Sequence, residues 1–111
     1  MSTVTQRMLK QTIAVAMGAD AVVWGQGEDA VLNGGTRLVA WLRYNDPAVL
    51  SVSLWIQATP DAPFTLQSTE ALASGSSVYS VPVAGYAARL TADWNVAPGD
   101  PDVEVSAQVQ S

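Results

Sequence analysis

Alternation of apolar and polar residues at every second position is the feature of this sequence that most restricts its fold. It is clearest near the C-terminus, where apolar residues at positions 103, 105, 107 and 109 alternate with Glu, Ser and Gln. Residues 88–96 alternate in the same way and place Trp94 on their apolar side. Because successive side chains of a strand point to opposite faces, both runs predict β-strands with one buried face. The turn-rich segment 97–102 between them predicts a hairpin connection.

Two further strands are predicted in the middle of the chain. Residues 50–58 alternate and place Trp55 on the outer side of their strand. Residues 37–45 are apolar on both faces, which is typical of a central strand that is covered on two sides. Trp41 is therefore expected in the core, as is Trp94.

Three shorter strands are predicted from residues 21–25, 62–68 and 77–83, and Pro82 favours an edge position or a bulge for the last of them. Strands that recur about every ten residues, without a long helical pattern, are typical of a sandwich, a jelly roll or a small barrel. The 111 residues suffice for one hydrophobic core. The sequence therefore predicts an all-β fold, a single antiparallel, jelly-roll-like β-sandwich of about seven or eight short strands with an N-terminal arm.

The first 18 residues are predicted to lie outside the sandwich domain, which we place at residues 19–111. Residues 6–11 have a composition that a helix tolerates, with Met8 and Leu9 as their only apolar members, so residues 1–18 are interpreted as an arm or a short helix. The apolar stretch 12–17 is shorter than the core of a signal peptide, and no run approaches the roughly 20 apolar residues of a membrane-spanning helix. We therefore expect no membrane partner, and use in a cytoplasm or in a particle assembled there.

Charge and residue types argue against several classes of function. The net charge is −5 and the five basic residues form no cluster, whereas nucleic-acid binding needs a concentrated positive face. The chain has no His and no Cys, so it lacks the commonest general base and the commonest ligands of transition metals. Asp100, Asp102 and Glu104 lack the spacing of an EF-hand loop. We therefore expect no enzyme activity, no metal, no cofactor and no direct contact with nucleic acid.

Binding to other proteins is the function that the composition favours. Only 14% of the residues are charged, below the roughly 25% of an average soluble domain, so the surface is weakly protected against association. Trp55 and Gln57 are predicted to share an outer sheet face, where a Trp can contact a protein or stack on a sugar. On the N-terminal segment, Met8, Leu9 and Ile13 are predicted to contact a partner as a bridging arm.

The pattern from Gly35 to the C-terminus resembles small β-sandwich proteins encoded among the virion genes of tailed bacteriophages. The features that carry the resemblance are strands like residues 37–42 and 51–58, a Thr-Pro-Asp turn at residues 59–61, a Gly-aromatic-x-x-Arg-Leu strand at residues 85–90 and the final alternating strand. The sequence departs from that pattern at Ala62-Pro63, where those proteins have a Gly-rich hairpin. The N-terminal 35 residues have no counterpart.

The resemblance implies a non-enzymatic capsid decoration (cement) protein of the virion, which binds and stabilises the lattice of the major capsid protein. A homo-oligomer is expected with it, a trimer in particular. A head-tail or tail accessory protein is the alternative within the particle. From the residues alone, a carbohydrate-binding module that uses Trp55 with Gln57 or Tyr79 is a further alternative.

Overall fold

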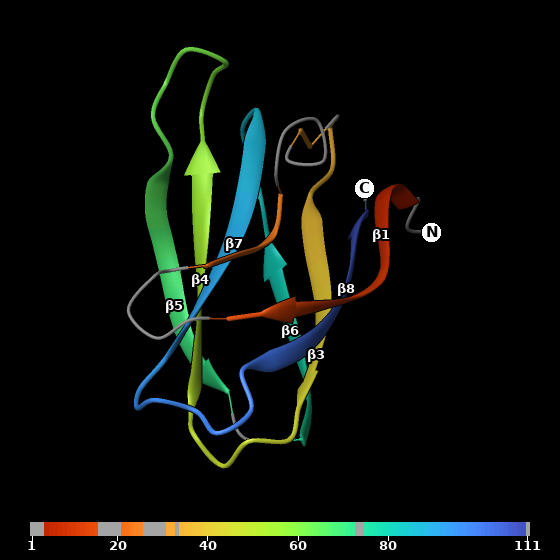
Figure 1. Cartoon of the computed structure of the whole chain (residues 1–111). Helices are drawn as coiled ribbons and strands as arrows, with labels where there is room; N and C mark the ends of the chain where they lie inside the picture. Colours follow the sequence, from red (N-terminus) through yellow and green to blue (C-terminus); the bar gives the residue numbers. More distant parts are fainter. Residues whose placement is uncertain (1–3, 16–20, 26–30, 33, 73–74, 111) are drawn as a thin grey trace.

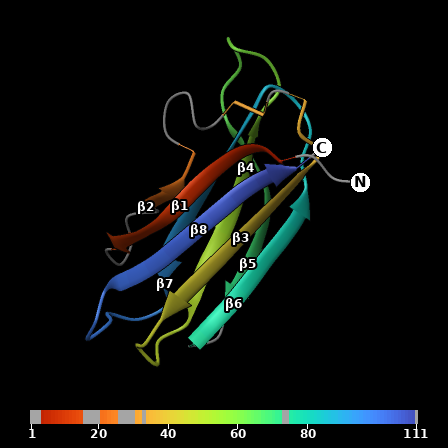
Figure 2. The same cartoon turned by 90° about the vertical axis from the view of Figure 1, so that its right-hand side faces the viewer.

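The computed structural model describes residues 4–15, 21–25, 31–32, 34–72 and 75–110, with the backbone alone for residues 4–11 and 76. In these residues eight strands form two antiparallel sheets of four (Figure 1). Sheet A, which faces the viewer in Figure 2, has the order β1 (Val4–Ala14), β8 (Asp102–Gln110), β3 (Arg37–Tyr44), β6 (Gly75–Pro82). Sheet B has the order β2 (Ala21–Trp24), β7 (Ala87–Trp94), β4 (Leu50–Gln57), β5 (Thr65–Leu72).

The pairing of the strands is that of a jelly roll. Strand β1 pairs with β8, β2 with β7, β3 with β6 and β4 with β5, as if one long hairpin had been folded over. The pairs β3–β8 and β4–β7 then join these ladders into two sheets. Eight strands in two packed sheets with this nesting form the double Greek key of a jelly roll. The predicted all-β, jelly-roll-like sandwich is confirmed.

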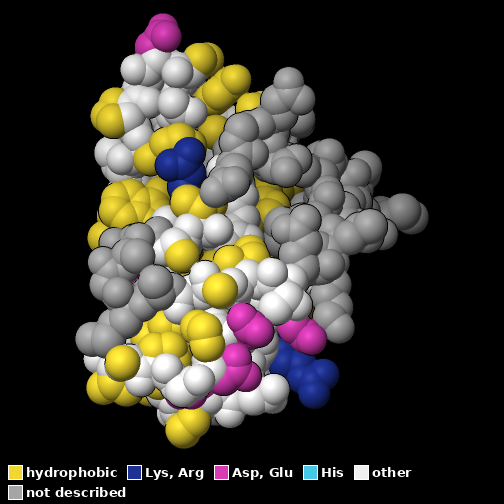
Figure 3. Space-filling view, viewed as in Figure 1, with side chains coloured by type: hydrophobic (Ala, Val, Ile, Leu, Met, Phe, Trp, Pro, Cys, Tyr) yellow, Lys and Arg dark blue, Asp and Glu magenta, His cyan; other side chains and the backbone are white. Residues whose placement is uncertain are grey.

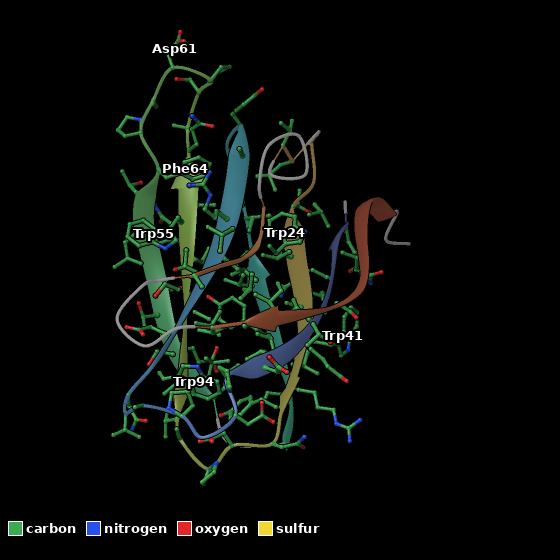
Figure 4. All side chains as sticks on the ribbon, in the orientation of Figure 1. Trp24, Trp41, Trp55, Asp61, Phe64 and Trp94 are labelled. Carbon is green, nitrogen blue, oxygen red and sulfur yellow. The ribbon has the colours of Figure 1, made fainter. Side chains whose placement is uncertain are left out.

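The core lies between the sheets, and the alternation seen in the sequence fills it. Along β8, every second residue from Val103 to Val109 is buried and the residues between are half-buried. Strand β4 alternates in the same way over its first five residues. Trp24 and Trp94 lie between the two sheets, with only 2% and 3% of their surface exposed (Figure 4). The predicted core position of Trp94 is confirmed.

Trp41 departs from its predicted position in the core. Leu38, Ala40, Leu42 and Tyr44 are the residues of β3 that point inward, so the register of the strand turns Trp41 to the outer face, where it is 43% exposed. The prediction was wrong because β3 is apolar on both faces, and nothing in the described part of the chain covers the outer one.

The N-terminal segment also differs from the expected arm or short helix. Residues 4–14 form an edge strand that pairs with β8 from Val4↔Gln110 to Ala14↔Asp102, with two irregularities of register. Pairing satisfies the backbone groups of β8 that would otherwise be exposed at the edge of the sheet. Most of the predicted arm is therefore part of the sandwich, and residues 16–18 lie outside the described residues.

The predicted edge position of the strand that ends at Pro82 is confirmed, because β6 is the last strand of sheet A.

The polar groups of two buried aromatic side chains, Tyr44 and Trp94, donate hydrogen bonds to the backbone of other strands or their ends. The Tyr44 hydroxyl donates a hydrogen bond of 2.7 Å to the carbonyl of Leu72 at the end of β5. The Trp94 indole N–H donates one of 2.8 Å to the carbonyl of Val15, just after β1. Burial raises the pKa of the Tyr44 hydroxyl, as expected for a group whose charged form would lose its hydration.

Asp46 holds two loops together at one end of the sandwich. Its carboxylate accepts backbone N–H bonds from Ala48 at 2.9 Å, from Gly99 at 2.7 Å and from Asp100 at 2.9 Å. The loop between β3 and β4 is thereby fixed to the loop between β7 and β8. These bonds, that to Ala48 first, lower the pKa of Asp46 because they stabilise its charged form.

Candidate binding surfaces on the two outer faces

The outer face of sheet A carries an exposed apolar centre, which we call the Trp41 face. It consists of Arg37, Val39, Trp41 and Arg43 on β3 together with Val78 on β6. Trp41 stands opposite Val78 in the β3–β6 pair, and Val78 is 58% exposed. Figure 4 shows Trp41 on the side of sheet A that points away from the core.

Two arginines stand at the ends of this face. Arg37 donates a hydrogen bond of 2.9 Å from Nη1 to the hydroxyl of Ser80, its near neighbour on β6. Arg43, at the other end of β3, is exposed and lies opposite Glu104 of β8. A row of Arg, Val, Trp and Arg has the composition of a protein interface, in which aromatic residues and Arg are enriched.

The outer face of sheet B carries a second group, the Trp55 cluster, made of Trp55, Phe64, Leu66 and Arg89. Trp55 of β4 stands opposite Leu66 of β5 on one side and Arg89 of β7 on the other. The Arg89 guanidinium lies 4.2 Å from the centre of the Phe64 ring, a cation–π contact. Figure 4 shows Trp55 and Phe64 on the sheet B side of the molecule, opposite Trp41.

Hydrogen bonds fix the side chains of the Trp55 cluster in place. The indole N–H of Trp55 donates to the Thr91 hydroxyl at 2.8 Å, and Nε of Arg89 donates to the Gly25 carbonyl at 3.4 Å. Leu66 is 52% exposed, whereas Trp55 is half-buried, as its neighbours Phe64 and Arg89 are. In Figure 3 a basic side chain lies among hydrophobic ones in the upper half of the molecule, and acidic side chains gather in the lower half. The cluster is therefore a partly apolar surface in which hydrogen bonds hold the Trp55 and Arg89 side chains.

Gln57 and Tyr79, the other residues predicted to bind a partner or a sugar beside Trp55, have different positions in the structure. The Gln57 amide donates to the carbonyls of Ala62 at 2.8 Å and Pro60 at 3.3 Å, so it supports the turn after β4. Tyr79, expected beside Trp55 in a sugar site, is 3% exposed, and its hydroxyl hydrogen-bonds Ser68 at 2.8 Å between the two sheets. The expected role of Tyr79 in a sugar site is therefore wrong, because an inward residue of β6 cannot reach the outer face of sheet B.

The N-terminal residues Met8, Leu9 and Ile13 lie on β1. Met8 is opposite Ala107 of β8, and Leu9 falls in the irregular stretch after it; the side chains of both lie outside the described residues. Ile13 is half-buried and packs against the core. Partner binding by these three residues stays a prediction.

An open groove lies between the edge strands β5 and β6. It has a volume of about 460 Å³ and is lined by Leu54, Ile56, Gln67, Ser68, Val81, Pro82, Val83 and Ala84. Six of these eight lining residues are apolar, and Gln67 and Ser68 are polar. A second, polar cleft of about 340 Å³ lies at the end of the sandwich near Arg43, Asp100, Asp102 and Glu104.

The described residues contain no group of three or more His, Cys, Asp or Glu side chains that could hold a metal ion. No helix in the described part of the chain is long and apolar enough to cross a membrane. The side chains that stand out on the two outer sheet faces are aromatic, apolar and basic ones, and aromatic residues and Arg are enriched in protein interfaces. Sequence reasoning missed Trp41, and its one signal was the apolar outer row of β3.

Comparison with known proteins gives a fold and no family. No protein-family model matches the chain, and no curated protein matches it in sequence. Among solved structures, the chain is similar to the SPBc2 prophage-derived protein YomS, with a TM-score of 0.50 and 16% sequence identity over 98% of both chains. The likeness spans nearly the whole of both chains and shows a shared fold.

Proposed function

We propose that this protein is a non-enzymatic structural component of a tailed-bacteriophage particle, and that it is a capsid decoration protein which binds the lattice of the major capsid protein. The phage context is supported by the fold, which is shared with a protein described as prophage-derived. Jelly rolls are also a common architecture of viral capsid domains.

The observation that carries the proposal is that interface-type side chains stand on both outer faces of one thin sandwich. The Trp41 face lies on sheet A and the Trp55 cluster on sheet B, on opposite sides of a molecule whose shortest extent is 20 Å. A small domain with two such faces can contact two neighbours at once. Weak contacts that are repeated by the symmetry of a shell add up to strong retention.

The test is co-sedimentation of the purified protein with phage particles that lack it, after separation into heads and tails. Binding to heads supports a decoration protein. Binding to tails or to the head-tail junction alone would contradict the capsid assignment and support the accessory role. The matched variants are Leu66→Asp in the Trp55 cluster and Val96→Asp at a loop position that is also exposed. We expect only Leu66→Asp to weaken head binding.

A carbohydrate-binding module is the second candidate, and one observation favours it: the half-buried Trp55 ring is fixed by its bond to Thr91. Gln57 is engaged by the backbone of its own turn, and Tyr79 is buried, so neither of the two polar residues expected beside Trp55 is available to recognise sugar hydroxyls. Glycan-array binding that disappears in Trp55→Ala would support this candidate over the capsid proposal.

A further inference from the structure

The hydrophobic core is incompletely covered at the groove between β5 and β6. Among the described residues, four partly buried apolar side chains pack against the core, and two of them, Ile56 and Val81, line this groove. Ile56 belongs to sheet B and Val81 to sheet A, so the groove opens between the two layers. Its volume of about 460 Å³ lies within the range of about 300–1,000 Å³ that binding sites span. Apolar side chains of a partner placed there would extend the core.

An irregularity in β5 forms one side of the groove. Ser68 stands opposite Leu54 and Leu66 opposite Trp55, so Gln67 is an extra residue on β5. Such a bulge bends the strand that carries it. Gln67 and Ser68 both line the groove, and the Ser68 hydroxyl hydrogen-bonds the hydroxyl of Tyr79 on β6 at 2.8 Å. This bond joins the two edge strands at the border of the groove.

Strand β6 presents an unpaired backbone edge beside the groove. It pairs with β3 over eight successive residues without an irregularity, and no described strand lies on its other side (Figure 2). Exposed edges are usually protected by charged residues, Pro, bulges or short length. Strand β6 has no charged residue, and its Pro82 stands at its last position. Strand β2, in contrast, has only four residues, and β1 has two irregularities of register.

The edge and the groove together specify an extended segment as the occupant. The free N–H and C=O groups of an edge strand are satisfied by a further strand that pairs with it. Every second side chain of that strand would point toward sheet B and hence to the groove. None of the eight lining residues is charged, and an unpaired charge among apolar side chains is costly. The side chains that enter the groove are therefore apolar.

Glu70 indicates where the segment carries a positive charge. It stands opposite Val52, a buried residue of β4, so its side chain starts from the inner side of sheet B, where it is exposed at the open edge. Burial raises the pKa of the Tyr79 hydroxyl, and the nearby charge of Glu70 adds to this effect. Tyr79 and Val81 are successive residues on the inner face of β6. A residue two positions after an apolar residue beside Val81 would therefore lie near Glu70.

We propose that β6 and the groove bind an extended segment of a partner protein, with apolar residues at alternate positions and a Lys or Arg beside Glu70. The segment runs antiparallel to β6, because antiparallel pairing is slightly more stable per residue. Main-chain hydrogen bonds supply affinity in this mode of binding, and the groove supplies specificity. The site is separate from the Trp41 face and the Trp55 cluster, and it does not depend on the capsid assignment.

The first part of the test uses the synthetic peptide Thr-Val-Thr-Val-Thr-Lys-Thr with both ends blocked. Isothermal titration calorimetry with the purified full chain is expected to show saturable binding of one peptide per chain. Replacing both Val residues of the peptide by Ser should raise the dissociation constant by about tenfold or more, because their buried apolar area is lost. Replacing Lys by Gln should raise it by only about two- to fivefold, as is usual for an exposed ion pair.

Variants of the protein locate the bound peptide. Ala84→Asp puts a carboxylate at an exposed residue of the groove and should raise the dissociation constant by about tenfold or more. Ala71→Asp makes the same change at an exposed residue of β5 outside the groove, and should leave binding unchanged. Glu70→Gln should weaken binding of the Lys peptide and leave binding of the Gln peptide unchanged, so a double-mutant cycle isolates the pair. Circular dichroism establishes that the variants are folded.

Amide hydrogen exchange measured by NMR tests whether the peptide pairs as a strand. Alternate residues of an antiparallel edge strand turn their N–H groups away from the strand they pair with. The peptide is therefore expected to slow the exchange of alternate amides of β6, with no change in β1, at the opposite edge of sheet A.

Several results would overturn the proposal. They are the absence of saturable binding, equal affinity for the Val and Ser peptides, an effect of Ala84→Asp no larger than that of Ala71→Asp, and a bound peptide that leaves β6 exchange unchanged. Slow exchange of β6 amides in a dimer of the chain without peptide would show that a second copy pairs there instead. Phage particles are absent from these measurements, so a failure here is distinct from a failure to bind heads.

Discussion

The rings of Tyr44 and Trp94 meet edge to face inside the sandwich, with their centroids 5.0 Å apart and their planes at 82°. Tyr44 belongs to sheet A and Trp94 to sheet B, so this contact joins the two layers. The Tyr44 hydroxyl also donates a hydrogen bond to the carbonyl of Leu72 at the end of β5. The Trp94 indole N–H donates one to the carbonyl of Val15, just after β1. Four strands therefore converge on one aromatic pair.

Tyr44→Phe keeps the ring and removes the hydroxyl that binds the Leu72 carbonyl. A buried acceptor left without its donor costs about 1–3 kcal/mol, so we expect the free energy of unfolding to fall by that amount. Chemical denaturation with an unchanged m-value measures it. Tyr86→Phe, at an exposed residue, is the control and should change stability by less than about 0.5 kcal/mol. Equal effects of the two substitutions would contradict this account of Tyr44.

Asp46→Asn tests the junction between the two end loops. The three backbone N–H bonds lower the pKa of Asp46, so its stabilising effect is present above the ordinary carboxyl value and is lost as the pH falls through the lowered value. We expect the variant to melt at a lower temperature than the wild type at pH 7. The two melting temperatures should converge in strong acid, where the wild-type carboxylate is also protonated. A gap that stays constant from neutral pH to pH 2 would refute the carboxylate's role.

Gly25→Ala tests the close approach of β2 to β7. Gly25 has a φ of +95°, and a Cβ there would lie 2.6 Å from the Ala88 carbonyl oxygen and 2.9 Å from Arg89 Cα. Gly34→Ala is the matched control, since its φ is +81° but nothing lies within 4 Å of the added atom. Gly34→Ala should lose about 1 kcal/mol through backbone strain alone. Gly25→Ala should lose clearly more, because backbone atoms must move as well, and comparable losses in thermal melts would remove the clash as its cause.

Arg89→Met tests whether the charge of Arg89 rigidifies the Trp55 cluster. Removing the cation over the half-buried Phe64 ring should destabilise the fold by only about 0.5–1 kcal/mol. Binding to phage heads should weaken more than this loss explains, because Phe64 and Trp55 would be less well ordered before they bind. Arg43→Met, on the opposite face, controls for the loss of one positive charge. Head binding that is unchanged in Arg89→Met would exclude the cluster as the lattice contact.

Much of the fold could be predicted from the sequence, because apolar residues at every second position identify a strand wherever one of its faces is buried and the other is polar. The strand that contains Trp94 and the final alternating strand follow this rule directly. Strand β1 was not predicted, because its sequence shows no clean alternation of apolar and polar residues. It is an edge strand and pairs only with β8. Its pairing is determined by β8, which is close in space and far away in sequence.

The binding surfaces were harder to predict than the strands. The outward position of Trp55 follows from the alternation of β4, and its contacts with Leu66 and Arg89 require the register of two neighbouring strands. The apolar residues on both faces of β3 predict a core position for Trp41. An apolar row on both faces of a strand predicts cover on both sides, but no described segment covers the outer face of β3, so Trp41 is exposed rather than in the core.

The measurement that tests the central claim most directly is a titration of phage heads lacking this protein with the purified chain, counting the copies bound per head. A decoration protein is predicted to saturate at a fixed number set by the symmetry of the shell, with Leu66→Asp shifting the curve to higher concentration and Val96→Asp leaving it in place. Binding that never saturates, or that is absent at micromolar protein, would contradict the account.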